Sequence, residues 1–394
     1  MKILFFTQYE ITHEDLYAVL RKMGHQVKKV NHEMNDYCID YQFSAWLQSE
    51  LENEEYDLIF SVYFIPLISK IAYLKKIKYV VWIFDAMTLA MYSQMIFSPY
   101  NYIFTFDRED CEELKRKGIK NVWHLPLAVN VERVKAQLCD DGYEELVDSV
   151  TFLGSLYTGK YDFFSQIENL PDYILGYVDA LVASQLCIPG SELMRELVTN
   201  EFVNELNKYA TIECPDEFLY TSKDVFIDML LKKTTITERE KILNDISSKY
   251  KLTIFTNSDT RNLPNAIIRG YADYYTDMPQ IFHKSAINLN ITHRAIKSGI
   301  SLRALDVMGA GGFLISNYQP ELCELFVPNE EFVCYYDMLD LQEKVCYYMK
   351  NPDERKAIAK RGQEKIERYY TYEIQLKKMF EIINKNEITQ VNKN

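Results

Sequence analysis

Short apolar runs alternate with polar or amphipathic stretches along the first 130 residues. The first run, residues 2–7, predicts a strand, and the helix expected after it carries Leu16, Val19 and Leu20 on one face and ends at Gly24. Buried parallel strands separated by helices have this pattern, so we predict a doubly wound α/β domain. Further apolar runs lie at residues 57–62, 79–84, 102–106 and 122–127.

A second alternation begins at residue 150 with the apolar run VTFLGSL. The segment from about residue 160 to 250 is predicted to be mostly helical. Because it is far longer than an ordinary α/β crossover, we interpret it as a helical insertion. Strands and helices then alternate again, and a charged helix follows Pro352. The later predicted strands lie at residues 251–257, 287–292, 311–317 and 332–337.

The length of the chain also indicates two domains. At 394 residues it exceeds the size at which one hydrophobic core usually stops growing, about 250 to 300 residues. We predict an N-terminal Rossmann-like domain and a C-terminal Rossmann-like domain joined by an acidic, helix-prone linker. The predicted parts are 1–130 for the first domain, 131–149 for the linker, 150–370 for the second domain, and 371–394 for a final helix and tail.

Charge and cysteine usage exclude several classes of function. The net charge is 44 − 57 = −13, and no block of Lys or Arg could track a phosphate backbone, so nucleic acid is not an expected partner. No apolar run approaches the roughly 20 residues that span a bilayer, and the N-terminus is unlike a signal peptide. Eight scattered cysteines without a CxxC pair argue against zinc and against a disulfide framework. We therefore expect a cytoplasmic protein.

In an open parallel sheet, ligands bind beyond the carboxyl ends of the strands. After the strand that begins at residue 150 comes a turn of Gly154 and Ser155, with Lys160 nearby. Its bare backbone N–H groups and the lysine could bind an anionic group. A plain tight turn that needs no ligand is the alternative.

The segment from residue 271 to 321 carries the sequence pattern that is most specific for a ligand site. Two asparagines alternate with apolar residues in the strand predicted at 287–292, and buried amides require partners. Three cationic or ionisable residues follow beside a predicted helix start. Arginine and a helix N-terminus both favour anions, which predicts a diphosphate site, although Arg294 and Lys297 as plain solvated cations is the alternative. Of these residues, Arg294 and Lys297 are predicted to bind the diphosphate. The donor sugar and nucleoside are predicted to contact Asn288, Asn290, His293, Ser298 and Gly299.

Asp306 follows eight residues after Ser298, on a helix that ends in a glycine cluster with Gly311 and Gly312. A carboxylate in this position can accept both hydroxyls of a ribose. Arg303 lies one turn earlier, where it could pair with Asp306 or reach a phosphate. A purely structural ion pair is the alternative.

Asp85 directly follows the apolar strand predicted at 79–84. A carboxylate beyond a buried strand is well placed to deprotonate an acceptor hydroxyl, so we predict Asp85 as a general base. It could instead cap the next helix. Asp107 and Arg108, after the following strand, are interpreted as structural.

Three segments together resemble a known family: MPQIFHKSAINLNIT, GISLRALDVMGAGGFLISNYQPEL and NPDERKAIAKRGQEKIERYYTYE. They are similar to the spore-maturation CgeB-like glycosyltransferases, a branch of the GT-B superfamily. YVVWIFDAM and NYIFTFDRE resemble the N-terminal domain found with them. The likeness covers nearly the whole chain and is strongest from 270 to 372. It implies a GT-B fold, with two Rossmann-like domains facing across a cleft.

The resemblance also implies site roles. Retaining GT-B enzymes carry two glutamates separated by seven residues, for the donor sugar and the ribose, and here Ser298 and Asp306 have that spacing. Asp306 would keep the ribose role, whereas Ser298 has lost the carboxylate. The Gly-Arg and Lys motif of the group is only partly matched by Gly154, Ser155 and Lys160. We include Tyr274, Met278, Pro279, Gly311 and Gly312 among the expected donor sugar and nucleoside contacts.

The expected activity is transfer of a sugar from a nucleotide-diphosphate sugar to a hydroxyl on a protein or a surface glycan. A UDP-linked donor such as UDP-GlcNAc or UDP-glucose would be a co-substrate, with no cofactor. No metal is expected, because Asp140 and Asp141 lie in the linker and the acidic run at 337–340 lies near a late strand. A nucleotide-sugar epimerase or hydrolase, or a non-catalytic nucleotide-sugar-binding protein, are the alternatives. A bacterial source and a homodimer are further expectations.

Overall fold

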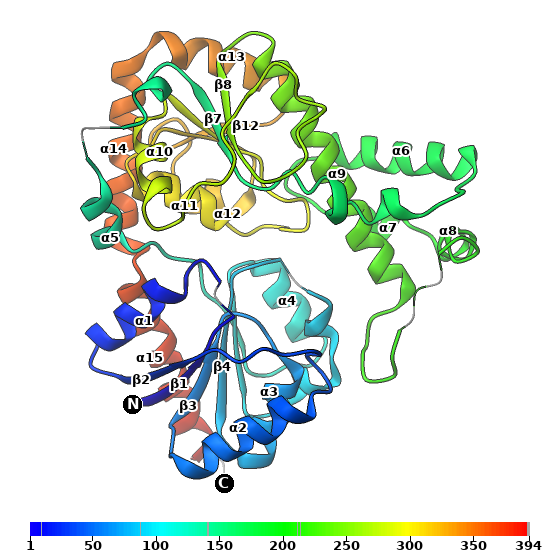
Figure 1. Cartoon of the computed structure of the whole chain (residues 1–394), viewed down its shortest axis with the longest axis vertical. Helices are drawn as coiled ribbons and strands as arrows, with labels where there is room; N and C mark the ends of the chain where they lie inside the picture. The colour runs from blue at the N-terminus through cyan, green and yellow to red at the C-terminus, as the bar shows by residue number, and fades with distance from the viewer. Residues whose placement is uncertain (9, 87, 140–141, 211, 213, 392–394) are drawn as a thin grey trace. The chain divides into compact units, whose positions relative to one another are not determined.

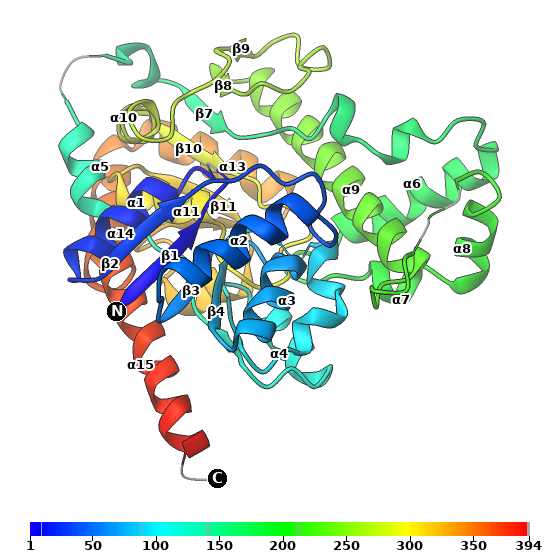
Figure 2. The same cartoon turned by 60° about the horizontal axis from the view of Figure 1, so that its bottom comes forward.

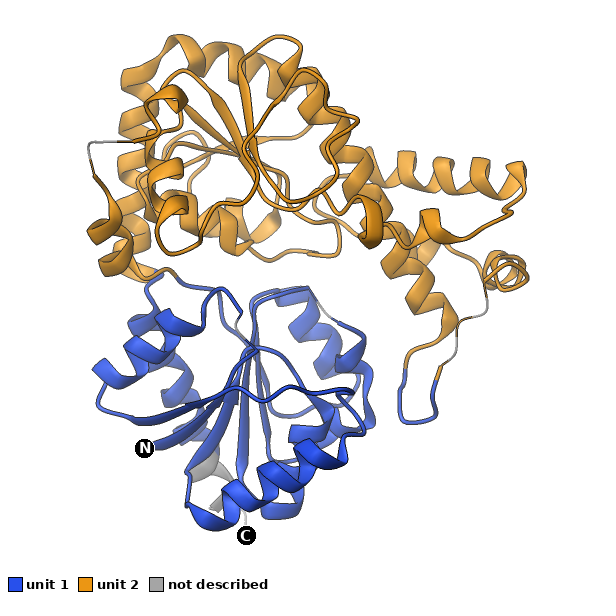
Figure 3. Ribbon diagram, in the orientation of Figure 1, with its two compact units in different colours: residues 1–128, 215–219, 370–394 blue, residues 129–214, 220–369 orange. Residues whose placement is uncertain are grey.

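The structure, a computed structural model, describes residues 1–8, 10–86, 88–139, 142–210, 212 and 214–391. The Asp140 and Asp141 pair of the predicted linker lies outside the described residues. The chain divides into two compact units (Figure 3). Unit 1 consists of Met1–Ala128, Pro215–Leu219 and Tyr370–Asn394, and unit 2 consists of Val129–Cys214 and Tyr220–Tyr369.

Unit 1 is built on a parallel six-stranded sheet with the strand order β2-β1-β3-β4-β5-β6. The chain moves from β1 to β2 on one side and then crosses to β3 on the other, so the topological switch point lies between β1 and β3. Its strands are β1 (Lys2–Phe6), β2 (Gln26–Val30), β3 (Leu58–Ser61), β4 (Lys78–Ile83), β5 (Asn101–Thr105) and β6 (Val122–His124).

Helices cover both faces of this sheet (Figure 1). One face packs on α2, α3 and α4, and the last helix of the chain, α15, contacts α1. Tyr372 at the start of α15 lies against the rings of Trp82 and Phe84, so the chain's end belongs to the core of unit 1. The helices are α1 (His13–Lys22), α2 (Tyr41–Asn53), α3 (Pro66–Lys75), α4 (Arg108–Arg116) and α15 (Tyr372–Val391).

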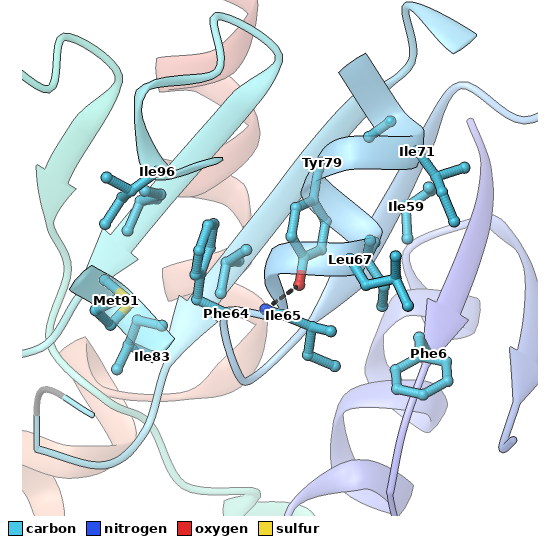
Figure 4. Close-up of a cluster of buried hydrophobic side chains, with 14 of the residues drawn as sticks. Phe6, Ile59, Phe64, Ile65, Leu67, Ile71, Tyr79, Ile83, Met91 and Ile96 are labelled. Carbon is cyan, nitrogen blue, oxygen red and sulfur yellow. Dashed lines mark hydrogen bonds between the residues drawn. The ribbon is translucent and has the colours of Figure 1, made fainter. Parts of the chain in front are cut away.

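The hydroxyl of Tyr79 on β4 is a polar anchor in the core of unit 1 (Figure 4). It accepts from the backbone N–H of Ile65 at 3.1 Å and donates to the carbonyl of Tyr63 at 3.0 Å. Ser61 also contacts it, at 2.8 Å. Buried polar groups need partners, and Tyr79 supplies hydrogen bonds to the backbone of the loop after β3. These bonds hold Tyr63 at the carboxyl end of the sheet.

Unit 2 repeats the architecture with the strand order β12-β11-β10-β7-β8-β9, all parallel. The predicted pair of doubly wound α/β sheets is thus confirmed. The chain runs from β7 to β8 and β9 on one side and returns to β10 on the other, which places the switch point between β7 and β10. The strands are β7 (Val150–Leu153), β8 (Leu252–Phe255), β9 (Ile267–Ile268), β10 (Ile287–Asn290), β11 (Leu314–Asn317) and β12 (Val333–Tyr335).

The helical part of unit 2 has a hydrophobic core of its own. Side chains from α6, α7, α8 and the first half of α9 form this core, whereas the last turns of α9 pack on the sheet through Ile242, Leu243 and Ile246. Figures 1 and 2 show α9 running from the sheet out to the other helices of the insertion. The insertion helices are α6 (Asp172–Leu186), α7 (Met194–Leu197), α8 (Asn200–Leu206) and α9 (Ser222–Ser247).

The compact units differ in detail from the divisions predicted from the sequence. The first helix after the break, α5, belongs to unit 2 and not to a separate linker, and α15 belongs to unit 1. The remaining helices of unit 2 are α5 (Val131–Gln137), α10 (Asp277–Lys284), α11 (Leu302–Gly309), α12 (Pro320–Leu325), α13 (Met338–Lys350) and α14 (Pro352–Tyr369).

Candidate functional site at the switch point of unit 2

A buried arginine joins the two strands of the switch point. Arg239, from the middle of α9, donates from Nη2 to the carbonyl of Ile291 after β10 at 2.6 Å, and from Nε to the same oxygen at 3.2 Å. Its Nη1 donates to the carbonyl of Ser155 after β7. These carbonyls belong to the residues just beyond the strands' carboxyl ends, so the guanidinium lies where an open α/β sheet binds its ligands.

The charge of Arg239 is buried without an ion-pair partner among the described residues, although the field of Glu238 acts on it. The residue is only 8% exposed, and its guanidinium lies 5.1 Å from the ring centre of Tyr157 and 5.5 Å from that of Phe152. No carboxylate in the described part of the chain lies within ion-pair distance of it. Burial lowers the pKa of Arg239, and an arginine nevertheless stays protonated in proteins. The site therefore contains a fixed positive charge.

Tyr157 occupies a strained backbone position in the same place. Its φ is +59°, in the left-handed region that bulky residues rarely adopt. The ring packs edge-on against the ring of His293, with centroids 4.8 Å apart, while its face meets Arg239. Such strain persists where surrounding contacts enforce it and is concentrated at functional sites.

His293 is a neutral hydrogen-bond donor in this setting. Its Nδ1 accepts the backbone N–H of Ala295 at 3.0 Å, so in the neutral ring the proton lies on Nε2. Burial, with the nearby charges of Arg239 and Lys232, lowers the pKa of His293 to about 3. At neutral pH the switch point thus offers an imidazole N–H beside the guanidinium.

The depressed pKa of His293 predicts a pH-dependent stability. The unfolded chain binds a proton here below a pKa of about 6.5 and the folded chain does not until about pH 3, so the free energy of unfolding falls as the pH drops through this window. As the pH falls, the free energy of unfolding of His293→Gln should decrease by up to about 1.4 kcal/mol less per pH unit than that of wild type. Urea unfolding of both proteins at pH 7, 6 and 5 measures this; parallel pH curves would contradict it.

Arg294, predicted to bind a diphosphate, is paired inside the protein. Its Nε and Nη2 bind the two oxygens of Glu238 at 2.7 and 2.5 Å, and its backbone N–H is bonded to the hydroxyl of Thr235 at 3.0 Å. The two charged side chains are 8% and 9% exposed. Arg294 therefore locks the loop after β10 to α9 with its charge already neutralised. The predicted alternative, a solvated Arg294, is wrong.

Ser298 and Glu321 form a buried pair between the same loop and α12. The Ser298 hydroxyl donates to Glu321 Oε1 at 2.7 Å, and the backbone N–H of Glu321 donates back to the Ser298 carbonyl at 3.1 Å. Both residues are 1% exposed. A carboxylate thus lies beside the position where the glutamate of the resembled motif is replaced by serine. Gly299 is also buried, whereas Lys297 is partly exposed.

Asp306 lies on α11 in a mixed polar and aromatic setting. It is 5% exposed and accepts from the hydroxyl of Tyr274 at 3.2 Å. Arg303 lies 3.9 Å from its Oδ2, donates to Met278 Sδ at 3.0 Å and covers the ring of Phe282. Pro279 is buried in the first turn of α10, next to Met278. The Arg303 and Asp306 pair therefore exists in the protein, in contact with α10.

Tyr157, which contacts Arg239, also acts electrostatically on Arg303. The Arg303 and Asp306 pair therefore lies near the cluster of Arg239, Tyr157 and His293 in unit 2. Burial lowers the pKa of Arg303, and the Asp306 carboxylate opposes that shift. The two groups present two cations, one carboxylate and a neutral imidazole at one edge of the sheet. This set suits a ligand that carries both phosphate charge and hydroxyls.

The two asparagines of β10 lie on the face opposite its apolar side chains. Asn288 Nδ2 donates to the carbonyl of Phe282 at 2.8 Å, and Asn290 Nδ2 donates to Ser316 Oγ at 2.9 Å. Gly312 passes so close that a Cβ there would lie 2.5 Å from the Phe282 oxygen, and Gly311 turns the chain with a φ of +69°. These contacts fix the amide nitrogens and the two glycines, while the buried Oδ1 of Asn288 has no hydrogen-bond partner within the described ranges, and the predicted contact of all four residues with a donor stays a prediction.

The turn after β7 is held by neighbouring loops. The backbone N–H of Gly154 donates to the carbonyl of Phe255, and Ser155 Oγ lies 3.3 Å from Ser258 Oγ. Lys160 is exposed, with its ammonium 5.0 Å from the ring centre of Tyr161. The structure thus brings Ser155 to Arg239 but leaves Lys160 on an exposed turn.

In unit 1, Asp85 follows β4 and hydrogen-bonds Tyr63. Asp85 is exposed, and the charge of Glu10 also acts on Tyr63. Burial and these two carboxylates raise the pKa of Tyr63, which keeps it a phenol that can donate to Asp85. Asp107, after β5, caps α4 by accepting the backbone N–H of Glu109 at 2.9 Å.

Neither a metal-binding cluster nor a membrane span occurs in the part of the chain that the structure describes. Its residues contain no group of three or more His, Cys, Asp or Glu side chains arranged to hold a metal ion. None of its helices is both long and apolar enough to cross a bilayer.

Comparison with known proteins adds a family match and a fold. Residues 238–381 match the family described as glycosyl transferase-like. No curated protein matches the sequence. Solved structures match over almost the whole chain, at low sequence identity.

Three examples have TM-scores from 0.52 to 0.54. The Anabaena protein HepE in complex with UDP-glucose has a TM-score of 0.54 and 9% identity, over 98% of this chain and 100% of that one. A glycosyltransferase from Rickettsia africae gives 0.53 and 11%, with 97% of each chain covered. Sucrose-phosphate synthase from Thermosynechococcus elongatus gives 0.52 and 11%, over 99% and 100%. The chain therefore has the α/β fold of GT-B glycosyltransferases, with two parallel six-stranded sheets and their surrounding helices.

Proposed function

We propose that this protein is a glycosyltransferase that takes a sugar from a nucleotide-diphosphate sugar bound by unit 2 and transfers it to a hydroxyl acceptor bound by unit 1. The observation that carries the proposal is the glycosyl transferase-like match over residues 238–381, because that segment supplies most of the polar groups at the β7–β10 switch point. The fold alone would not decide the activity.

The donor nucleotide is proposed to be UDP, carrying glucose or GlcNAc. The structurally similar HepE was solved with UDP-glucose, which supports the choice of base. In unit 2 the ribose hydroxyls would donate to Asp306, and Arg303 and Lys297 would face the negative charge that grows as the sugar leaves. Such stabilisation of the leaving group needs no metal ion.

The acceptor would be a hydroxyl of a protein or a surface glycan. Asp85, with Tyr63 beside it, would accept the proton of that hydroxyl. The finer assignment, to the CgeB-like branch and to a cytoplasmic bacterial enzyme that can form a homodimer, rests on the sequence resemblance and composition.

The experiment that tests the proposal is turnover of UDP-glucose and UDP-GlcNAc with and without a panel of glycan and protein acceptors, in the presence of EDTA. Release of UDP that depends on acceptor and gives a glycosylated product supports a metal-independent transferase. Epimerised donor without acceptor would identify an epimerase, and UDP release without acceptor a hydrolase. Binding without turnover would identify a non-catalytic nucleotide-sugar-binding protein.

Asp306→Ala is expected to weaken UDP binding by roughly 1 to 3 kcal/mol, the usual cost of losing a charged hydrogen-bond partner. Tyr274→Phe is the matched control, because it removes the protein's own donor to Asp306 but keeps the carboxylate. Calorimetric titration of both variants with UDP measures the difference. Unchanged affinity in a folded Asp306→Ala protein would remove Asp306 from the nucleotide site.

A further inference from the structure

We propose that Arg239, supplied by helix α9 of the insertion, binds the diphosphate of the donor together with the cations Arg303 and Lys297. This rests on the proposed function, since the diphosphate belongs to the nucleotide sugar. It also gives the helical insertion a direct part in donor binding, because α9 belongs both to the insertion's core and to the sheet of unit 2.

The guanidinium of Arg239 has no ion-pair partner among the described residues. Arg239 is more than nine-tenths buried, and it contacts the carbonyls of Ser155 and Ile291, the ring of Phe152, and the ring and hydroxyl of Tyr157. A buried charge is costly unless an opposite charge meets it. Glu238 next to it in sequence cannot fill this place, since both of its oxygens bind Arg294.

The guanidinium of Arg239 also has the geometry to bind a phosphate. A guanidinium has five N–H groups in a planar fork that matches phosphate oxygens. In Arg239 the backbone carbonyls take Nε and one N–H from each Nη, so each Nη carries a second N–H. These carbonyls fix the fork at the carboxyl ends of β7 and β10, and the Nε2–H of His293 adds a neutral donor at the same place.

Two of the cations predicted for the diphosphate, Arg294 and Lys160, are placed elsewhere by the fold. The diphosphate motif of the resembled group has an arginine where this chain has Ser155. Arg239 donates to the backbone carbonyl of that same Ser155. Its guanidinium, supplied by α9, therefore lies next to the position where the motif has its arginine. Arg294 is neutralised by Glu238, and Lys160 lies on an exposed turn.

The test is calorimetric titration of the full chain with UDP, uridine and inorganic pyrophosphate. The variants are Arg239→Gln, Arg239→Lys and the control Arg261→Gln. Arg261 lies in the loop after β8 with an 89% exposed side chain, so its removal changes net charge equally without touching the switch point. For Arg239→Gln we expect affinities for UDP and pyrophosphate about 10- to 100-fold lower and an unchanged affinity for uridine.

Arg239→Lys should give an intermediate loss, because it keeps the charge but not the fork, and Arg261→Gln should bind as wild type does. If Arg239→Gln fails to fold, the lysine variant still reports the ratio of UDP to uridine affinity. Equal losses for UDP and uridine would make Arg239 merely structural, and unchanged UDP binding would also overturn the inference. Wild-type protein that binds pyrophosphate through Arg239 but transfers no sugar would refute the proposed function alone.

Discussion

Replacing Asp85 by asparagine is expected to lower the rate of glycosyl transfer about 10²- to 10⁴-fold, the range typical of a positioned general base. The asparagine would keep the size of the side chain and an oxygen that accepts from Tyr63, so the fold and the donor affinity should stay as in wild type. Hydrolysis of the donor should suffer less if other groups can activate water.

Asp107→Asn is the matched control for this change. Both aspartates lie two residues beyond the end of neighbouring parallel strands, β4 and β5, but Asp107 is fully buried and caps α4. Asparagine caps helices about as well as aspartate, so transfer by the control should remain close to wild type. Transfer rates of both variants under saturating donor give the comparison. Near-normal transfer by Asp85→Asn would reduce Asp85 to a structural residue.

The stereochemistry of the product decides how Asp85 acts. An inverted anomeric configuration fits direct deprotonation of the acceptor by the carboxylate. With retention, the departing phosphate could take the proton, and Asp85 would orient the acceptor instead. In that case the asparagine variant should raise KM more than it lowers kcat, because an amide still binds a hydroxyl.

The sequence predicted the two sheets because their central strands are buried on both faces. Every strand predicted from an apolar run corresponds to a strand of the structure. The two that escaped prediction, β2 and β9, are edge strands. In β2 the lysines Lys28 and Lys29 break the apolar pattern, and β9 has only two residues, Ile267 and Ile268. Edge strands carry weak patterns, since half of their surroundings is solvent.

The site was harder to predict because its charges come from elements far apart in sequence. Residues 288–306 were recognised as polar and cationic, but nothing in that segment shows that Arg294 is neutralised by Glu238, 56 residues earlier. Glu238 and Arg239 lay inside a stretch interpreted as insertion. The sequence shows only that Thr234, Thr235, Glu238 and Arg239 are polar residues one turn apart on a predicted helix. Their burial, which identifies them as part of the site, is visible only in the structure.

The Glu238 and Arg294 pair leads to the second large expected effect. Glu238→Gln should lower the free energy of unfolding by about 3 to 5 kcal/mol, the usual cost of leaving one partner of a buried ion pair without its countercharge. The glutamine can still accept one hydrogen bond, but the guanidinium of Arg294, 8% exposed, would lose the opposite charge that its burial requires.

The double variant Glu238→Met/Arg294→Met should recover most of this loss, since replacing a whole buried pair by apolar residues of similar volume is often nearly neutral. Asp228→Asn is the control on the same helix, because its pair with Lys232 is 33% and 26% exposed and should contribute less than about 1 kcal/mol. Urea unfolding should be followed by far-UV circular dichroism, as Trp46, Trp82 and Trp123 all lie in unit 1 and do not report on α9. A double variant as unstable as Glu238→Gln would show that the pair's hydrogen bonds to the loop, and not its charge balance, hold α9 to β10.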